Sequence, residues 1–197
     1  VADMANALEG EGYRVVAGIN GDFYNVSTGL PIGLVITDGV LRSSDAGYYA
    51  IGFRADGTAV LGKPGVKVSA DLGYAVDDGS GSPVELIRPV IAVNKARTNS
   101  GVFLYTYDFN AKHTTGTTEA GVNVVCTVEQ GQLAIGSTVT ARVERVEETT
   151  VTAIQPDQIV LSANANADAY YTNALRNMSA GSEVTLTVSA NAGWDDV

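Results

Sequence analysis

An amide, a glycine, a carboxylate and an aromatic ring stand together in Asn20-Gly21-Asp22-Phe23, directly after the apolar run Val15–Ile19. The run predicts a buried strand that opens into a loop at Asn20. Binding and catalytic groups concentrate on such loops, because the strand fixes side chains that substrate and water can still reach. The alternative is a plain turn, in which Asn20 adopts a left-handed backbone and Asp22 caps it.

A second group of polar residues lies around a predicted strand in the middle of the chain. Asn94 and Arg97 precede this strand, Thr106 ends it, and a threonine-rich loop that contains Thr115 follows. The planar guanidinium of Arg97 matches two phosphate oxygens. The amide and the hydroxyls can hold sugar hydroxyls or phosphate oxygens by neutral hydrogen bonds. The alternatives are a surface ion pair for Arg97 and an ordinary β-compatible loop for the threonines.

The order of these segments resembles the phosphodiester glycosidase family. The stretches that carry the resemblance are Asn20–Phe23, Pro31–Gly39, Asn94–Arg97, Val102–Thr106, Thr114–Thr118, Gly121–Val125, Ile159–Ala163 and Gly181–Val184. The resemblance implies a hydrolase that cleaves the glycosidic bond of a sugar-1-phosphodiester, located outside the cytoplasm or at the cell surface. The site residues expected are Asp22 and Arg97 as catalytic groups and Asn20, Asn94, Thr106 and Thr115 as substrate-binding groups.

The chemistry of this reaction gives the two charged residues different roles. Cleavage at the anomeric carbon develops positive charge on the sugar while a phosphate departs. Phosphate is a good leaving group, so its protonation matters less than in an ordinary glycoside. Arg97 would neutralise the phosphate, and Asp22 would stabilise the sugar cation or position the attacking group.

Two departures from the family pattern favour functions other than catalysis by this chain. Family members usually carry a glutamate where this chain has Asn123, so an expected acid is absent. Family domains also continue beyond the stretches matched here, and the chain opens directly in a predicted helix. We therefore expect residues 1–197 to be a single family-like domain that is truncated at both ends. The rival function is a non-catalytic carbohydrate- or cell-envelope-binding module on the same scaffold, and a third reading is a purely structural surface domain.

Composition narrows the choice of partner. The formal charge is −10, from 12 basic and 22 acidic residues, and no basic cluster is present, which argues against nucleic acid as a partner. No apolar run approaches the roughly 20 residues that span a membrane.

The lone Cys126 is expected to be a buried hydrophobic residue. His113, the lone histidine, is expected in a loop near the site and cannot build a histidine metal cluster. No cofactor is implied, a divalent cation and the oligomeric state stay open, and the expected partner is a sugar-phosphate or a glycan.

The pattern of turns and apolar residues predicts an α+β fold, a β-rich domain with several hairpins and a few short helices. Asp38-Gly39 and Asp56-Gly57 are typical of hairpin turns, so neither aspartate is a catalytic candidate. A helical stripe runs from Ala167 to Met178, with Asn166 as the expected N-cap and Gly181 as the stop. Further predicted elements are a helix with Met4 and Leu8 on one face, strands over Val84–Val93 and Val139–Val146, and a solvated loop at Asp77–Pro83.

Overall fold

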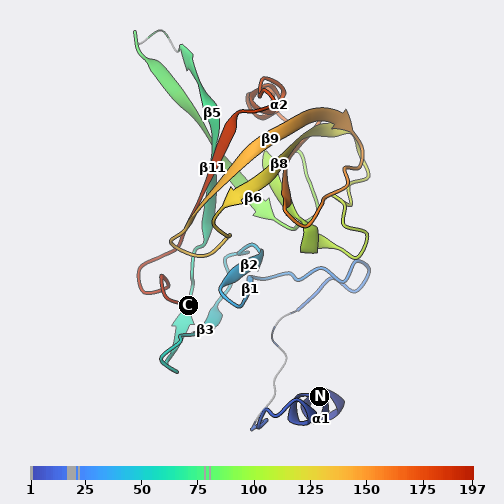
Figure 1. The fold of residues 1–197 in the computed structure, drawn as a ribbon, viewed down its shortest axis with the longest axis vertical. Helices are drawn as coiled ribbons and strands as arrows, with labels where there is room; N and C mark the ends of the chain where they lie inside the picture. Colours follow the sequence, from blue (N-terminus) through green and yellow to red (C-terminus); the bar gives the residue numbers. More distant parts are fainter. Residues whose placement is uncertain (1, 17–20, 22, 78, 80) are drawn as a thin grey trace. The chain divides into compact units, whose positions relative to one another are not determined.

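A computed structural model gives the fold and describes residues 2–16, 21, 23–77, 79 and 81–197 (Figure 1). The chain forms two compact units, residues 1–32 and 33–197. The second unit holds a seven-stranded barrel, so the predicted β-rich α+β class is confirmed. That residues 1–197 behave as one domain stays a prediction.

The first unit contains the predicted amino-terminal helix and a tight turn. Helix α1 spans Ala2–Gly10, and none of its residues is buried. The turn is organised by Asn25, whose side-chain oxygen accepts hydrogen bonds from the backbone N–H groups of Ser27 and Thr28. The predicted strand before Asn20 is wrong in its described part, because residues 13–16 have no regular structure and Val16 is 83% exposed. A short apolar run becomes a strand only when it finds a pairing partner, and residues 17–20 lie outside the described residues.

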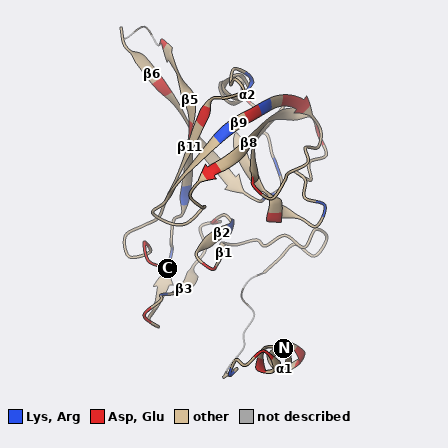
Figure 2. Cartoon of the chain, viewed as in Figure 1, with Lys and Arg blue, Asp and Glu red and all other residues tan. Residues whose placement is uncertain are grey.

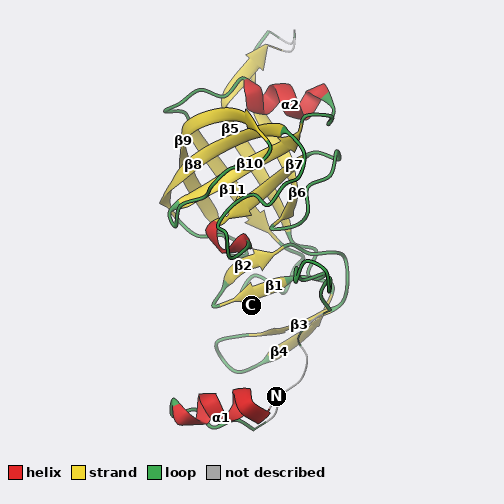
Figure 3. Cartoon of the chain, turned by 90° about the vertical axis from the view of Figure 1, so that its right-hand side faces the viewer, coloured by secondary structure: helices red, strands yellow, loops and turns green. Residues whose placement is uncertain are grey.

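The second unit is built on a closed barrel with the strand order β10-β7-β6-β5-β11-β9-β8. Its strands are β5 (Lys67–Asp77), β6 (Pro83–Val93), β7 (Val102–Thr106), β8 (Gly121–Gln130), β9 (Thr138–Thr149), β10 (Gln158–Asn164) and β11 (Glu183–Ser189). All neighbours are antiparallel except β6 and β7. Figure 3 shows the tilted strands closing around one interior.

The single parallel pair of the barrel determines where Arg97 lies. Val90 of β6 pairs with Val102 of β7, although the chain between the two strands consists only of residues 94–101. A parallel connection normally needs a dozen or more residues. Here the loop is short because β7 begins beside the end of β6, so the chain has to return over only a few residues. Arg97 sits in this return loop.

Strand β5 bends where it leaves the barrel wall. Gly73 has a φ of +71°, and a Cβ at this position would overlap the backbone oxygen of Glu183 on β11. The pairing with β6 shifts register between Asp71 and Ala75, on either side of this glycine. Beyond the bend, β5 and β6 continue as a hairpin arm that projects from the barrel (Figure 1). The predicted loop at Asp77–Pro83 forms its tip, of which Asp78 and Ser80 lie outside the described residues.

Alternating residues of the strands separate the barrel interior from an outer cluster. On β7, Val102 and Leu104 belong to the large buried cluster that fills the barrel, whereas Phe103 and Tyr105 belong to a smaller cluster on the outside. Cys126 lies in the interior cluster, and burial raises the pKa of its thiol to about 12. The predicted role of Cys126 as a buried hydrophobic residue is confirmed. Polar residues at outward positions near the smaller cluster form the candidate site below.

Two small hairpins follow the predicted Asp-Gly turns. Strands β1 (Val35–Thr37) and β2 (Val40–Ser43) join through Asp38 and Gly39, which both have positive φ, as a type I′ turn requires. Strands β3 (Ala50–Phe53) and β4 (Ala59–Gly62) join through a loop in which Asp56 accepts hydrogen bonds from the backbone N–H and the hydroxyl of Thr58. Both aspartates are turn residues, as predicted.

Helix α2 packs on the barrel and confirms the predicted helix, with a correction at each end. The helix ends at Arg176 with Asn177 as its C-cap, so Gly181 is not its stop. It spans Ala169–Arg176, and its buried residues include Ala174 and Leu175. The N-cap is Asp168 rather than the predicted Asn166, because the Asp168 carboxylate accepts a hydrogen bond from the N–H of Tyr170. Two carboxyl or amide side chains compete for this position, and the sequence pattern does not say which one meets the first free N–H groups.

The predicted half-exposed strand over Val139–Val146 is the central part of β9. Its inward positions are buried and its outward positions carry charges, which Figure 2 shows along the strand. Arg142 pairs with Glu129, and Arg145 lies between Glu144 and Glu147. These exposed pairs stabilise little, so this face is a solvated surface.

Candidate functional site

Arg97 reaches from its loop onto the outer face of the barrel. Its Nη1 donates to the Ser162 hydroxyl at 2.7 Å and to the Asn123 side-chain oxygen at 3.4 Å. Its Nη2 donates to the backbone oxygen of Glu119. Burial lowers the pKa of the Arg97 guanidinium, while Tyr105 and Glu119 nearby act in the opposite direction. The guanidinium is therefore a half-buried cation that neutral oxygens hold in place.

Both the oxygen and the nitrogen of the Asn123 side-chain amide form hydrogen bonds. Its oxygen accepts from Ser162 at 2.5 Å, and its Nδ2 donates to the backbone oxygen of Thr149 at 3.1 Å. The side chain is fully buried. The second bond needs an N–H donor, which an amide provides and a carboxylate does not. The geometry thus gives a physical reason for an amide at the position where the family resemblance led us to expect an acid.

Gly121 makes room for this arrangement. A Cβ at this position would lie closer than 3.0 Å to the Arg97 guanidinium and to the backbone oxygen of Ala163. Glu119 precedes it, with its carboxylate exposed and bound by the Nδ2 of Asn164 at 2.6 Å. The approach of Arg97 to the barrel wall therefore depends on a glycine at the start of β8.

The structure brings Asn94 and Thr106 together at the ends of β6 and β7. Asn94 is buried with a φ of +52°, and its Nδ2 donates to the Thr106 hydroxyl and to the backbone oxygen of Arg42, both at 2.9 Å. Its side-chain oxygen accepts from the Thr106 N–H at 3.0 Å. These bonds fix the start of the loop that carries Arg97, so the amide is engaged with protein groups.

Thr115 is 1% exposed and joins the threonine-rich loop to a neighbouring segment. Its hydroxyl accepts from the N–H of Thr152 at 3.1 Å and lies 3.0 Å from the Thr117 hydroxyl. The backbone N–H of Thr115 donates to the Thr152 oxygen at 2.9 Å. In this structure Thr115 therefore holds the loop against the segment between β9 and β10 rather than presenting a free hydroxyl.

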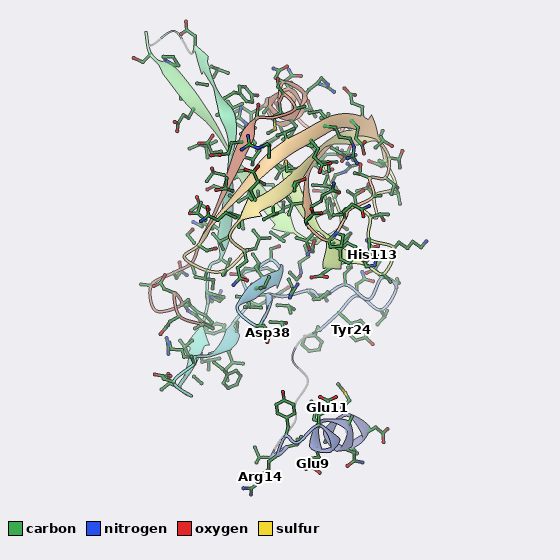
Figure 4. All side chains as sticks on the ribbon, in the orientation of Figure 1. Glu9, Glu11, Arg14, Tyr24, Asp38 and His113 are labelled. Carbon is green, nitrogen blue, oxygen red and sulfur yellow. The ribbon has the colours of Figure 1, made fainter. Side chains whose placement is uncertain are left out.

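His113 lies on the same segment, just after the short 3-10 helix η1 (Tyr107–Phe109), and is labelled in Figure 4. Its ring stacks on Tyr107 with centroids 3.7 Å apart and an interplanar angle of 1°. Its Nδ1 lies 3.0 Å from the Tyr107 backbone oxygen. The half-buried ring is thus held in place by Tyr107, as a loop residue.

Of the predicted site residues, Asn20 and Asp22 lie outside the described residues. Asn94 and Thr106 are bonded to each other, while Arg97 bonds to residues that the sequence argument did not assign to the site. That these predicted residues line one shared pocket stays a prediction.

The residues that sequence reasoning missed are Ser162, Glu119 and Gly121. The signal for Ser162 was a polar residue inside the apolar run Val160–Ala163, and the same signal marks Asn123 inside β8. A polar residue in a buried strand needs a bonding partner, and Arg97 is the partner of both.

Within the described ranges, no group of three or more His, Cys, Asp or Glu side chains is arranged to hold a metal ion. No described helix is long and apolar enough to cross a membrane.

Comparison with protein families identifies the class. The profile of the family described as phosphodiester glycosidase matches residues 13–141. This stretch covers most of the chain, including Arg97, Asn123 and the segment between them. The chain belongs to the phosphodiester glycosidase family. A search of curated proteins gives no match.

Two solved structures share the fold. A hypothetical protein from Synechocystis aligns over 88% of this chain with a TM-score of 0.58 and 16% identity. The "Putative exported protein" of Burkholderia pseudomallei K96243 aligns over 87% with a TM-score of 0.50 and 13% identity. The chain spans 28% and 36% of the lengths of these two proteins. At these identities the likeness concerns the fold alone.

Proposed function

We propose that this protein hydrolyses a sugar-1-phosphodiester by cleaving the glycosidic C–O bond and leaving the phosphate on the other alcohol. The observation that carries the proposal is the family membership over residues 13–141. The half-buried Arg97 guanidinium supports it, because neutral oxygens hold the cation and its charge stays available to a phosphate. The partner in this proposal is a sugar-phosphate or glycan substrate.

In the proposed reaction the two charged residues act on opposite halves of the substrate. Arg97 neutralises the departing phosphate, and Asp22 stabilises the positive charge on the sugar or positions the attacking water. The oxygen of water ends on the anomeric carbon, its proton is released, and the phosphate leaves with the bonding electrons. Asn20 contributes a neutral hydrogen bond to the substrate. Asn94, Thr106 and Thr115 contribute by fixing the loops that border it.

The bond that breaks can be identified with a nitrophenyl ester of a sugar-1-phosphate in ¹⁸O-labelled water. Glycosidic cleavage releases free sugar and nitrophenyl phosphate, and the label enters the sugar. Cleavage of the phosphate–aryl bond releases nitrophenol instead, and the label enters the phosphate. Labelled sugar from the full-length protein supports the proposal, whereas yellow nitrophenol with unlabelled sugar contradicts it.

Substitutions separate the roles of the two residues. Asp22→Asn keeps size and hydrogen bonding but removes the charge, so kcat should fall by about 10²-fold or more with little change in KM. Asp38→Asn is the matched control, because Asp38 forms a turn with a φ of +53° that asparagine also tolerates. Arg97→Lys keeps the charge but loses the planar fork, so it should weaken phosphodiester binding more than binding of the phosphate-free sugar. An unchanged kcat in Asp22→Asn would show that Asp22 is only a turn residue.

The second candidate is a non-catalytic carbohydrate- or cell-envelope-binding module on the same scaffold. The neutral Asn123 favours it, because the expected acid beside Arg97 is replaced by an amide. A titration with sugar-1-phosphate that gives binding without any release of sugar by the full-length protein would decide for the module.

We further propose a location outside the cytoplasm or at the cell surface, with the name of the Burkholderia neighbour as support. Fractionation of cells that express the full-length protein tests this location.

A further inference from the structure

The fold leaves hydrogen-bonding capacity unused beside Arg97, and we propose that Arg97 and Tyr105 together bind an oxyanion. The Nε of Arg97 and the hydroxyl oxygen of Tyr105 are both buried, and neither has a hydrogen-bond partner. Tyr105 pairs with Val160 of β10, two residues before the Ser162 that accepts from Arg97, so both atoms belong to the same outer face of the barrel. Buried polar atoms are nearly always satisfied in folded proteins, so two of them on one face point to a missing ligand. The inference rests on the proposed function in that a substrate phosphate is the oxyanion expected there.

The Nε–H of Arg97 is a donor without a partner. The group has five N–H donors, and its three hydrogen bonds all run from Nη1 and Nη2. None runs from the buried Nε. Nε and Nη2 share the edge of the planar group that matches two oxygens of a phosphate or carboxylate.

Tyr105 supplies a further donor from the neighbouring strand. Burial raises the pKa of its phenol, so the hydroxyl keeps its proton at neutral pH, and the nearby Arg97 acts in the opposite direction. The Tyr105 ring is fully buried and lies 5.0 Å from the Phe109 ring, which fixes its orientation. The hydroxyl is thus a positioned neutral donor on the face of the barrel where Arg97 binds Ser162.

The charges around Arg97 favour an anionic ligand. Among the residues that the structure describes, no carboxylate lies within the 4.0 Å of an ion pair from the guanidinium. Asn123 and Ser162 are neutral, and the Glu119 carboxylate is exposed and bound by Asn164. The only carboxylate that acts on the half-buried guanidinium among these groups is the more distant Glu119, and an oxyanion bound directly to Arg97 would offset more of the cost of burying the cation.

Access to the edge comes from the return loop itself. Ala96, Thr98, Asn99 and Ser100 are exposed, so this part of the loop can shift without breaking core contacts. Since Nε is buried, such a shift accompanies binding. Asn94 and the start of β7 remain fixed by their mutual hydrogen bonds.

The test uses inorganic phosphate as the probe and Tyr105→Phe as the variant. Thermal unfolding is followed at pH 7 while phosphate replaces chloride at constant ionic strength, and the shift in Tm gives the Kd. Tyr105→Phe should bind phosphate about tenfold more weakly, because one hydrogen bond to a charged ligand is lost. Without phosphate the same variant should melt at an equal or higher temperature, because it removes a buried hydroxyl that has no partner.

Tyr74→Phe is the matched control. The Tyr74 hydroxyl donates to the backbone oxygen of Ala174 at 2.7 Å, so its removal should lower Tm and leave the phosphate Kd unchanged. Arg97→Lys should abolish the phosphate-specific shift. The proposal is overturned if phosphate stabilises the wild type no more than chloride does, or if Tyr105→Phe binds phosphate as the wild type does.

The outcomes also separate this inference from the proposed function. A protein that hydrolyses the sugar phosphodiester but binds phosphate independently of Tyr105 refutes the inference alone. A protein that binds phosphate through Tyr105 but releases no sugar refutes the proposed function alone.

Discussion

Replacing Ser162 by alanine should destabilise the protein strongly, whereas the same change at Ser43 should not. Both serines are buried on strands, Ser162 with no exposure and Ser43 with 2%. The Ser162 hydroxyl accepts from Arg97 at 2.7 Å and donates to Asn123 at 2.5 Å. The Ser43 hydroxyl has no hydrogen-bond partner. The pair therefore isolates the two hydrogen bonds from the effect of removing a buried hydroxyl.

The size of the destabilisation follows from the hydrogen bonds that Ser162 forms with Arg97 and Asn123. A hydrogen bond to a charged group contributes about 1.5–3 kcal/mol and a neutral one about 1 kcal/mol, so Ser162→Ala should lower the free energy of unfolding by about 2–4 kcal/mol. With a urea m-value of about 2 kcal/mol/M, the unfolding midpoint should fall by roughly 1–2 M. Ser43→Ala should change the free energy by less than about 0.5 kcal/mol in either direction. Equal midpoints for the two variants would refute the reasoning that Ser162 anchors Arg97.

Three further predictions concern the barrel and its surface. Gly73→Ala should lower the free energy of unfolding by more than about 2 kcal/mol, because the new Cβ adds backbone strain and overlaps a backbone oxygen. Gly79 also has a positive φ but faces open space, so Gly79→Ala should cost only about 1 kcal/mol. Comparison of the two Tm values tests this difference. Hydrogen bonds, first from Thr127 and then from Gln158, lower the pKa of Glu144 below 4.5. The Glu144 carboxylate therefore stabilises the folded protein above that pH, and this stabilisation is lost as the pH falls through the lowered pKa of the folded state. Glu144→Gln should flatten the decline of Tm on the acid side of pH 4.5. Because burial raises the pKa of Cys126 to about 12, a thiol reagent at pH 8 should label it only after unfolding in urea, and rapid labelling of the native protein would contradict its burial.

Local signals predicted the elements of this fold better than their assembly. The Asp38-Gly39 turn, the helix within the range 167–178 and the alternation in β9 each reflect a pattern within a few residues, and each is found in the structure. The closed barrel does not follow from such patterns, because β10 pairs with both β7 and β8 across long stretches of chain. The N-cap of α2 was misassigned by two residues, since Asn166 and Asp168 carry equivalent capping chemistry.

In the candidate site too, the residue types could be predicted from the sequence but their spatial partners could not. The chemistry of Arg97 was readable from its residue type, but its partners were not, because Asn123 and Ser162 come from two strands that meet only in the barrel. The amide at Asn123 looked like a missing acid in the sequence and has its own bond to Thr149 in the structure. Asn94 and Thr106 were expected before and at the end of one strand, and their mutual hydrogen bonds could not be foreseen from spacing because they depend on the parallel pairing of β6 and β7.

The seam between β5 and β11 has a consequence for how the chain folds. Asp71 pairs with Thr185 and Val68 with Val188, so the wall closes between the first and the last strand of the barrel in chain order. Such distant pairing slows folding, because the entropy of closing a long loop is lost before the contacts form. During synthesis the barrel cannot close until β11 has left the ribosome, and until then β5 and β9 present open strand edges. The nascent chain is therefore most exposed to aggregation and proteolysis in the interval before its last strand emerges.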